Sequence, residues 1–542
     1  MYKVLLVQPN NDKNASNSAA SLQSAIRRDG RFTCRTADLS SFGNSMDADV
    51  DVILLNSFGQ NVELTDKQKM DFTQWVEKGG VLICCNRSLN IICDVAGVNA
   101  DIYKVDDAGV MEWISNGREE LTGNLPGMSL NDSNYLINLD KNTEGIETLY
   151  ESCWRMKRYP TVFTVAREQG LCIYLGAGLS ESTWKSASFV KLVLRLAAFG
   201  CGFHTTKKQL NFGILGYGGE FRMGLLHSQW IDSVSGLRTV AVCDNDPLRI
   251  QAARQELPGL EGYYTDLDDM LKMKEVDVIV NILPHHLHAP LSMKCLLAGK
   301  HVICEKPFCL NLDEADKMIE LAEEKNLMLS IFHNRRWDSD YLTIKEIIRQ
   351  GLIGDIFHIE GSTGGFNHPG HSWRSDPDIS GGIMYDFGSH FVDWILNLVD
   401  SPIEQILGDM QKRVWHSVGN ADYGSAWLRF ENGATANLEV SNISACKRPK
   451  WRILGTKGSI EIPVGGELII LVSNVKGIRQ ETRMKAYTSP VAGLSYYQNI
   501  AGHMFYGDAL GVTAQDGKRV IGVLQTIHES WKQKKSLPPL VR

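Results

Sequence analysis

The sequence predicts an α/β protein of three domains, in which two doubly wound α/β units are followed by an α+β domain. A chain of 542 residues is too long for one hydrophobic core, because single cores rarely serve more than about 250–300 residues. Two segments, at residues 2–7 and 211–216, have the character of the first strand of a doubly wound unit. A complete pattern of strands and helices lies between them, so the two units are expected to be separate domains.

Composition and charge argue against several classes of protein. Hydrophobic residues make up 43% of the chain and charged residues 22%, which is typical of a globular protein. The net charge of −7 argues against a nucleic-acid partner, which usually requires a basic face. No apolar run reaches the ~18 residues of a membrane span, and the first residues lack the pattern of a secretory signal. We therefore expect a cytoplasmic protein with no membrane partner.

The twelve Cys residues are scattered singly, apart from Cys84 and Cys85, and form no CxxC pair. In a cytoplasmic protein this distribution predicts reduced thiols. It indicates neither a disulfide framework nor a metal site.

The first domain is expected over residues 1–205. Its expected elements are strands at 51–56, 81–85 and 171–175 and helices at 65–78 and about 185–199. The first helical pattern opens with Thr65 as a plausible N-cap and stops at Gly79. The polar stretch 202–208 has no periodicity and is the expected joint to the next domain.

The second domain, expected over residues 206–330, begins with a strand that runs into a glycine-rich turn. The turn comprises Gly216, Tyr217, Gly218 and Gly219, and a helical stretch follows. Glycines at such a turn let the backbone approach a pyrophosphate, which the free N–H groups of the helix then bind. Because Phe221 replaces the third glycine of G-x-G-x-x-G, the motif alone also fits a turn without a ligand.

Two later strands favour the dinucleotide site. The apolar run 239–243 ends in Asp244, whose carboxylate would accept hydrogen bonds from the adenosine ribose and repel a 2′-phosphate. The expected cofactor is therefore NAD rather than NADP. A third run, 276–282, leads to Leu283 and Pro284, where the nicotinamide ribose would pass. The order of these elements predicts a Rossmann NAD-binding domain.

The residues that follow carry a family resemblance. The chain reads P-x-x-x-H from Pro284, A-G-K-H-V from Ala298, E-K-P from Glu305 and G-G-x-x-x-D-x-G-x-H from Gly381. Over about residues 209–542 this pattern resembles the Gfo/Idh/MocA oxidoreductases, named for glucose–fructose oxidoreductase and inositol dehydrogenase. The resemblance implies that an NAD-dependent enzyme oxidises a secondary hydroxyl of a carbohydrate: a sugar, a glycoside or a cyclitol.

The resemblance also implies the residues of the site. The implied catalytic residues are Lys306, Asp386 and His390. The implied cofactor-binding residues are Gly216, Tyr217, Gly218, Gly219, Asp244, Leu283, Pro284, His288, Glu305 and Lys306.

The three catalytic residue types suit the oxidation of an alcohol, in which the hydroxyl proton is lost as hydride leaves for the nicotinamide. His390 is the expected general base, and Lys306 the group that stabilises the developing alkoxide. Asp386 lies four residues before His390, so in a helix the two side chains share a face. The alternatives are a buried structural histidine and a surface lysine after a strand. The dinucleotide motifs upstream favour catalysis.

Four further residues are expected to bind substrate: Arg336, Trp337, Trp373 and Arg374. The loop 370–374 is polar and aromatic, which suits stacking on a sugar ring. A capping loop with an interdomain ion pair fits the same residues equally well.

The third domain, expected over residues 331–542, is α+β with a large, mostly antiparallel, open-faced sheet. Alternation in 426–430 and 435–440, with a turn at 431–434, predicts a hairpin. Family members usually associate through the open face of this sheet, so the resemblance implies a homodimer or homotetramer.

Residues 1–205 resemble, more weakly, the ThuA-like branch of the glutamine-amidotransferase-like flavodoxin folds, which implies a flavodoxin-like α/β domain. The run Leu64-Thr65-Asp66-Lys67-Gln68 and the pair Gly79-Gly80 carry the resemblance. The family's histidine-rich first loop is Pro9-Asn10-Asn11-Asp12 here, and Asn86 replaces its strand-end histidine. Cys84 and Cys85 lie near the place of an amidotransferase nucleophile but lack its flanking glycines, so buried strand cysteines are expected. A binding or scaffolding role is expected.

Three functions remain open at this point. The first is a net dehydrogenase that releases NADH. The second is a redox-neutral glycosidase that works through a transient keto-sugar. The third is a non-enzymatic protein that binds NAD or a sugar as a signal.

Overall fold

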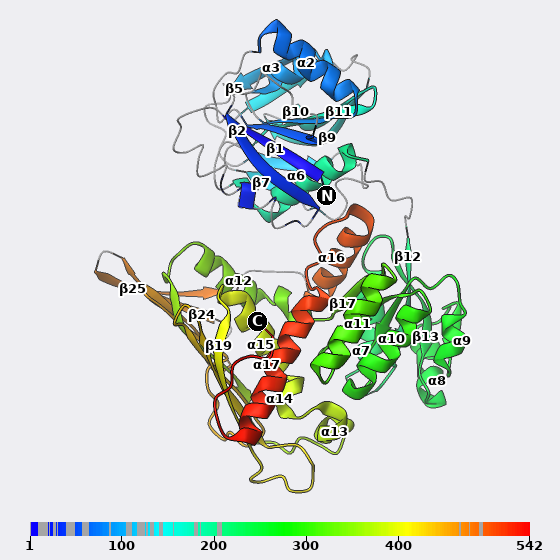
Figure 1. Cartoon of the computed structure of the whole chain (residues 1–542), viewed down its shortest axis with the longest axis vertical. Coiled ribbons are helices and arrows are strands. Elements are labelled where there is room, and N and C mark those ends of the chain that lie inside the picture. Colours follow the sequence, from blue (N-terminus) through cyan, green and yellow to red (C-terminus); the bar gives the residue numbers. More distant parts are fainter. Residues whose placement is uncertain are drawn as a thin grey trace. The chain divides into compact units, whose positions relative to one another are not determined.

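The computed structural model shows two compact units (Figure 1). One comprises residues 1–208 with 501–509, and the other residues 209–500 with 510–542. The described residues are 2–8, 20, 22–24, 26, 29, 31–38, 49–56, 64–85, 88–104, 111–115, 125, 128–130, 135–139, 145–154, 157–177, 183–184, 186–202, 209–219, 221–465, 468–475, 477–486 and 491–541. Most of the expected joint, the loop Pro9 to Asp12, and Asn86 lie outside the described residues.

The sheet of the first unit begins with parallel strands in the order β2-β1-β3-β4-β11. Their bounds are β1 (Tyr2–Gln8), β2 (Phe32–Asp38), β3 (Val52–Asn56), β4 (Val81–Cys85) and β11 (Gly170–Leu175). Alternate residues of β3 enter two cores on opposite faces, Val52 and Leu54 on one and Ile53 and Leu55 on the other. Burial on both faces explains why these strands are continuous apolar runs.

Helices flank this sheet. They are α2 (Asp66–Glu77), α3 (Leu89–Ala96) and α6 (Ala187–Gly200). Helix α2 begins with a capping box, in which Thr65 and Gln68 each accept the other's backbone N–H. Its last residue is Glu77, and Gly79, just beyond the C-cap Lys78, has a φ of 106° that is unfavourable for residues with a Cβ. Cys84 and Cys85 are fully buried in β4, as expected.

The rest of this sheet is antiparallel, which the doubly wound expectation did not include. The order continues β11-β10-β9-β6-β7. The bounds are β10 (Lys157–Arg167), β9 (Ile146–Trp154), β6 (Met111–Ser115) and β7 (Met128–Leu130), with a separate pair β5 (Ala100–Lys104) and β8 (Tyr135–Leu139). Strands β9 and β10 mix charged and apolar residues, so they lack the continuous apolar runs of the parallel strands.

The second unit opens with a parallel sheet in the Rossmann order β14-β13-β12-β15-β16-β17. The strands are β12 (Leu210–Leu215), β13 (Leu237–Cys243), β14 (Gly262–Tyr264), β15 (Val278–Asn281), β16 (His301–Cys304) and β17 (Leu329–Ile331). The connecting helices include α7 (Met223–Asp232), α8 (Pro247–Glu256), α9 (Leu267–Leu271), α10 (His288–Leu297) and α11 (Leu312–Glu324). The chain changes direction across the sheet between β12 and β15, and open α/β sheets bind ligands at the carboxyl ends of such strands.

A second sheet in this unit has the order β19-β20-β21-β18-β22-β23-β24-β25. Its strands are β18 (Ile356–Gly364), β19 (Ile403–Gln411), β20 (Tyr423–Phe430), β21 (Thr435–Ser441), β22 (Trp451–Gly455), β23 (Gly458–Ile462), β24 (Leu468–Val475) and β25 (Ile478–Lys485). All neighbours are antiparallel except β18 and β21, and the predicted β20–β21 hairpin is confirmed. Helix α17 (Ala514–Gln533) packs closely on β19, since a Cβ at Gly408 would lie 2.2 Å from the Ile527 carbonyl oxygen.

Helix α16 (Ala492–Tyr506) contributes to both units, because residues 501–509 group with the first. Within the first unit, the buried Asp508 carboxylate accepts hydrogen bonds from Arg195 Nε at 2.8 Å and Nη2 at 2.7 Å. Lys191 Nζ lies 2.9 Å from the same carboxylate. The segment 501–509 therefore belongs to the fold of the first unit, which the sequence pattern did not indicate.

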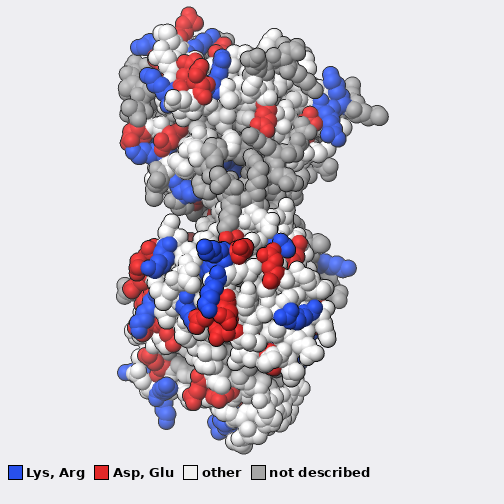
Figure 2. Space-filling model, turned by 90° about the vertical axis from the view of Figure 1, so that its right-hand side faces the viewer, with Lys and Arg blue, Asp and Glu red and all other residues white. Residues whose placement is uncertain are grey.

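No helix in the described part of the chain is long and apolar enough to cross a membrane. Figure 2 shows a face of the molecule on which acidic and basic side chains are interspersed.

Candidate functional site

The glycine-rich turn leaves room for a ligand beside the first Rossmann strand. Gly216 follows β12 with φ of 100°, and a Cβ there would lie 3.1 Å from the Leu283 side chain. A Cβ at Gly218 would meet nothing within 4 Å. Helix α7 then begins at Met223 without a side-chain cap. The N–H groups of its first turn are therefore available to an anion, as a pyrophosphate site requires.

Asp244 lies directly after β13 and contacts the turn. Its Oδ2 accepts the Tyr217 backbone N–H at 2.6 Å, and its Oδ1 accepts the Asp246 N–H at 2.9 Å. Each carboxylate oxygen retains acceptor capacity for a ribose hydroxyl. The same side chain therefore holds the turn in shape and offers acceptors beside it.

The residues after β15 and β16 form a second group at the carboxyl ends of the strands. His288 is buried, and its Nδ1 and Nε2 lie 2.7 Å and 2.8 Å from the carbonyl oxygens of Pro307 and Leu283. Its imidazole thereby connects the loop at Leu283 and Pro284 to the turn that contains the cis peptide before Pro307. Glu305 and Lys306 lie between β16 and that proline.

Lys306 forms an ion pair with Asp386 from the other half of the unit. Its Nζ lies 2.6 Å from Asp386 Oδ1 and 3.3 Å from the Asp386 carbonyl oxygen. Burial alone would raise the pKa of Asp386, but the charges of Lys306 and then His285 outweigh burial and hold this pKa well below its usual range. Asp386 is therefore ionised and fixes the ammonium group at the strand end.

The helix expected to carry both Asp386 and His390 is broken. Asp386 ends the short α14 (Ile383–Asp386), and His390 lies in α15 (Gly388–Leu398), with Phe387 between them. The two side chains are consequently not related by one continuous helical turn. The i, i+4 argument for a shared face is wrong in this detail, although both residues still lie near Lys306.

His390 is 5% exposed and lies in an aromatic environment. Its ring is 5.5 Å from the Phe387 ring, 5.9 Å from Trp394 and 6.1 Å from His333. Burial first, and then the charges of Lys306 and Arg335, lower the pKa of His390 well below its ordinary value. The imidazole is therefore neutral near pH 7 and can accept a proton.

The four expected substrate residues fall into two groups. Trp373 packs edge-on against His285 at 4.7 Å, and the Arg374 guanidinium lies 4.3 Å from the Trp373 ring and 4.6 Å from the Phe221 ring. These residues thus join the glycine-rich turn to the Lys306–Asp386 pair.

Arg336 and Trp337 have different partners. Arg336 binds both Asp393 oxygens, at 2.8 Å and 2.5 Å, and also the Gly511 carbonyl at 2.8 Å. Trp337 packs against Tyr496 at 5.8 Å. These contacts commit Arg336 to an ion pair inside the unit.

Three buried histidines were not singled out by the sequence analysis. His285 lies beside Asp386, and its Nδ1 is 2.7 Å from the Ser380 carbonyl oxygen. Both ring nitrogens of His333 are buried with no hydrogen-bond partner among the described residues. His227 contacts Glu305. His285 lies in the run Pro284-His285-His286-Leu287-His288, whose cluster of histidines is a signal that could have found it, whereas spacing gave no sign of the other two.

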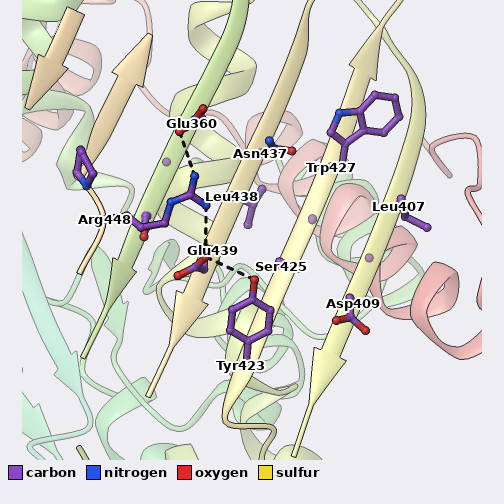
Figure 3. Close-up of a pocket in the computed structure, with 15 residues that line it drawn as sticks. Glu360, Leu407, Asp409, Tyr423, Ser425, Trp427, Asn437, Leu438, Glu439 and Arg448 are labelled. Carbon is purple, nitrogen blue, oxygen red and sulfur yellow. Dashed lines mark hydrogen bonds and ion pairs between the residues drawn. The ribbon is translucent and has the colours of Figure 1, made fainter. Parts of the chain in front are cut away.

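A separate hollow of about 260 Å³ lies on the open face of the second sheet (Figure 3). Strands β18 to β21 and the segment 448–449 line it. Arg448 pairs with Glu360 at 3.2 Å and with Glu439 at 3.5 Å across it. The hollow includes none of the predicted site residues.

Residues 210–333 match the family described as "Oxidoreductase family, NAD-binding Rossmann fold", and residues 341–461 match the "GFO/IDH/MocA C-terminal domain". The chain is 28% identical over 350 residues to the scyllo-inositol 2-dehydrogenase (NADP(+)) of Bacillus subtilis (strain 168), which covers 60% of this chain and 95% of the relative. It is 25% identical over 334 residues to the myo-inositol 2-dehydrogenase of Thermotoga maritima, which covers 60% and 98%.

A solved structure supports the same assignment. The NAD-binding protein from Listeria innocua superimposes with a TM-score of 0.56 at 27% identity, covering 62% of this chain and 98% of that one. Residues 210–333 and 341–461 thus match two domains of the Gfo/Idh/MocA oxidoreductases, the first of which is an NAD-binding Rossmann fold.

Proposed function

We propose that the protein oxidises a secondary hydroxyl group of a sugar, a glycoside or a cyclitol and transfers the hydride to NAD. The observation that carries the proposal is the Lys306–Asp386 ion pair beside the neutral imidazole of His390, at the carboxyl ends of the Rossmann strands. The substrate class is supported by two relatives that are named as inositol dehydrogenases.

The residues around the turn fit a dinucleotide, because Gly216 and Gly218 leave its backbone open and Asp244 offers carboxylate acceptors beside it. We assign the adenosine and pyrophosphate end to Gly216, Tyr217, Gly218, Gly219 and Asp244. We assign the nicotinamide end to Leu283, Pro284, His288, Glu305 and Lys306. Bound NAD would supply the hydride acceptor.

Each catalytic side chain has one role in this proposal. The neutral His390 accepts the hydroxyl proton as the hydride leaves. Lys306 donates a hydrogen bond to the oxygen on which negative charge develops. Asp386 keeps the Lys306 ammonium group in place through the 2.6 Å contact. Trp373 and Arg374 hold the substrate over the pair. Arg336 and Trp337 support the site indirectly, because Arg336 is paired with Asp393 and Trp337 packs against Tyr496.

A substrate screen tests the proposal. The purified chain is mixed with NAD and a panel of cyclitols, sugars and glycosides, and the near-ultraviolet absorbance of NADH is followed. Net dehydrogenation predicts accumulation of NADH with at least one member of the panel. Release of an aglycone without NADH would instead identify the redox-neutral glycosidase. Binding of NAD without turnover of any member would identify a non-enzymatic binding protein.

For the first unit we propose a binding or scaffolding role with a flavodoxin-like, ThuA-like origin. Burial raises the pKa of the Cys84 thiol well above its ordinary value, so this thiol is a poor nucleophile at neutral pH. Cys85 is buried in the same strand. Neither thiol offers an exposed group for chemistry.

We also propose that two or four copies associate through the open face of the second sheet. This face presents Trp427, Leu407 and the Arg448 ion pairs around the hollow of Figure 3. Leu407 is 43% exposed, as a residue of an interface core would be in the separate subunit. The molar mass in solution, measured by light scattering, tests this arrangement.

A further inference from the structure

A chain of hydrogen bonds leads from helix α7 to the residue before Lys306. His227, in the second turn of α7, is fully buried. Its Nε2 lies 3.2 Å from Glu305 Oε1, and its Nδ1 lies 2.7 Å from the Tyr497 hydroxyl oxygen. The other carboxylate oxygen of Glu305 accepts the backbone N–H of Lys306 at 2.9 Å. This network of hydrogen bonds therefore joins three elements: α7, the end of β16 and α16.

The chemistry of these groups places a proton on Nε2 of His227. An ionised carboxylate only accepts hydrogen bonds, so the ring nitrogen that faces it, Nε2, is the donor to Glu305. Nδ1 and the Tyr497 hydroxyl share a second hydrogen bond, which holds the ring in this orientation.

The carboxylate of Glu305 stays ionised although it is largely buried. Burial alone would raise its pKa, but the hydrogen bond and charge of His227 and the charge of Lys306 outweigh burial and lower the pKa below its ordinary value. The other titratable groups that face this network are His288, Tyr496, Tyr497 and Cys304. Each Glu305 oxygen keeps a free lone pair, so the carboxylate can also accept a ribose hydroxyl at the strand end.

We propose that His227 is a positioning residue that fixes the Glu305 carboxylate beside Lys306 and thereby connects the helix of the pyrophosphate turn to the nicotinamide end of the site. Helix α7, which begins beside the proposed pyrophosphate site, carries His227 one turn after its start. Glu305 in turn fixes the backbone of Lys306, whose side chain pairs with Asp386. The proposal rests on the proposed function only in that NAD is the cofactor.

Two amide substitutions of the full chain separate positioning from simple packing. In His227→Gln the amide nitrogen takes the place of Nε2 and can donate to Glu305. In His227→Asn the shorter amide takes the place of Nδ1 and cannot reach the carboxylate. The dissociation constant of NADH, measured by fluorescence quenching across pH, reports the ionisation of Glu305 without any substrate.

The expected result follows from the sign of the shift. Loss of the Nε2–H donor raises the pKa of Glu305. As the pH is lowered, the Glu305 carboxylate should therefore be protonated, and NADH binding weakened, at a higher pH than in the wild type. We expect the acid midpoint of binding to move up by about one pH unit in His227→Asn and to stay near the wild-type value in His227→Gln. A packing role would weaken binding without moving the midpoint. An unmoved midpoint in His227→Asn, or equal shifts in both variants, would overturn the proposal.

Two further outcomes are decisive. If His227→Asn does not fold, His227→Leu replaces it, because leucine removes the Nε2–H donor and fills a similar volume among the surrounding aromatic rings. Its midpoint must move in the same direction, and an unchanged midpoint rejects the proposal. If wild-type protein fails to bind NADH at any pH, the cofactor assignment is refuted and this proposal with it. That failure is distinct from binding with unshifted midpoints.

Discussion

Lys306 and His390 should be needed for turnover far more than for cofactor affinity. Lys306→Ala removes the group that stabilises the alkoxide, and His390→Ala removes the base. Each change should lower kcat by on the order of 10²–10⁴-fold, the usual cost of losing a positioned acid–base group. The dissociation constant of NADH should change little in His390→Ala. In Lys306→Ala, which also removes one contact of the nicotinamide end, it should rise by a much smaller factor than that by which kcat falls.

The exposed His416 provides the matched control for the histidine. His416→Ala should leave kcat unchanged. Wild-type turnover in Lys306→Ala or His390→Ala would contradict the catalytic assignment.

The pH dependence of turnover should respond to the charge of Arg335. After burial and Lys306, Arg335 is the next group that lowers the pKa of His390. His390 must be unprotonated to act as a base, so activity persists below the ordinary imidazole range and is lost as pH falls through the lowered pKa. In Arg335→Met the pKa rises, and the acid limb of kcat should move to higher pH. A kcat profile that does not move would show that another group limits the rate.

Sequence pattern found some of these residues and missed others for a physical reason. The E-K-P and D-x-G-x-H motifs identified Lys306, Asp386 and His390, because local spacing carries them. The contact between Lys306 and Asp386 joins residues 80 positions apart. The contact of Tyr497 with His227 joins residues 270 apart. Such contacts depend on the packing of separate elements, which no spacing in the chain records.

The end of strand β13 should decide between the two nicotinamide cofactors. Asp244→Ser removes the carboxylate that would repel a 2′-phosphate and accept from the ribose. The affinity for NADH should fall. The ratio of the dissociation constant of NADPH to that of NADH should decrease by at least about tenfold, which corresponds to a charged interaction of ~1.4 kcal/mol. Titrations of wild type and variant with NADH and with NADPH measure this ratio.

Because Asp244 also accepts the Tyr217 N–H at 2.6 Å, the turn itself should loosen. Asp244→Asn keeps the shape of the side chain and one carbonyl acceptor, so its loss of NADH affinity should be smaller. Equal affinity of the wild type for both cofactors would contradict the assignment.

The positions of strands buried on both faces could be predicted from the sequence. The positions of strands that mix charged and apolar residues could not. β4 and β12 are apolar runs that stop at turn residues, and their positions agree with the sequence. β9 and β10 mix charged and apolar residues, so they lack the continuous apolar runs by which the parallel strands were recognised. The break at Phe387 was also missed, although Gly388, which directly follows it, is a poor helix former.

In the molecule as a whole, the return of the chain at residues 501–509 should stabilise the first unit. Asp508→Ala leaves the Arg195 guanidinium, 3% exposed, without its carboxylate. Breaking a buried pair in this way costs about 3–5 kcal/mol, so the free energy of unfolding should fall by that order. Asp316→Ala, which removes an exposed partner of Lys518, should cost no more than about 1 kcal/mol. Chemical denaturation measures both variants.

The sign of the pH dependence provides a second check on Asp508. Burial raises its pKa, but Arg195 and Lys191 outweigh burial and lower it. The ion pair therefore stabilises the fold above the ordinary carboxyl range, and its contribution is lost as pH falls through the lowered pKa. Asp508→Ala should abolish this part of the acid sensitivity. Equal stability of variant and wild type at neutral pH would contradict the role of the pair.

The position of residues 501–509 in the chain has a consequence for synthesis on the ribosome. They follow residue 208 by 293 residues, which at a translation rate of ~5–20 residues per second take roughly 15–60 s to add. During that time Arg195 and Lys191 of the nascent first unit cannot form their ion pairs with Asp508, because Asp508 has not yet been synthesised. The first unit therefore reaches its final state only after nearly the whole second unit has been made, although its own strands are all synthesised before those of the second unit.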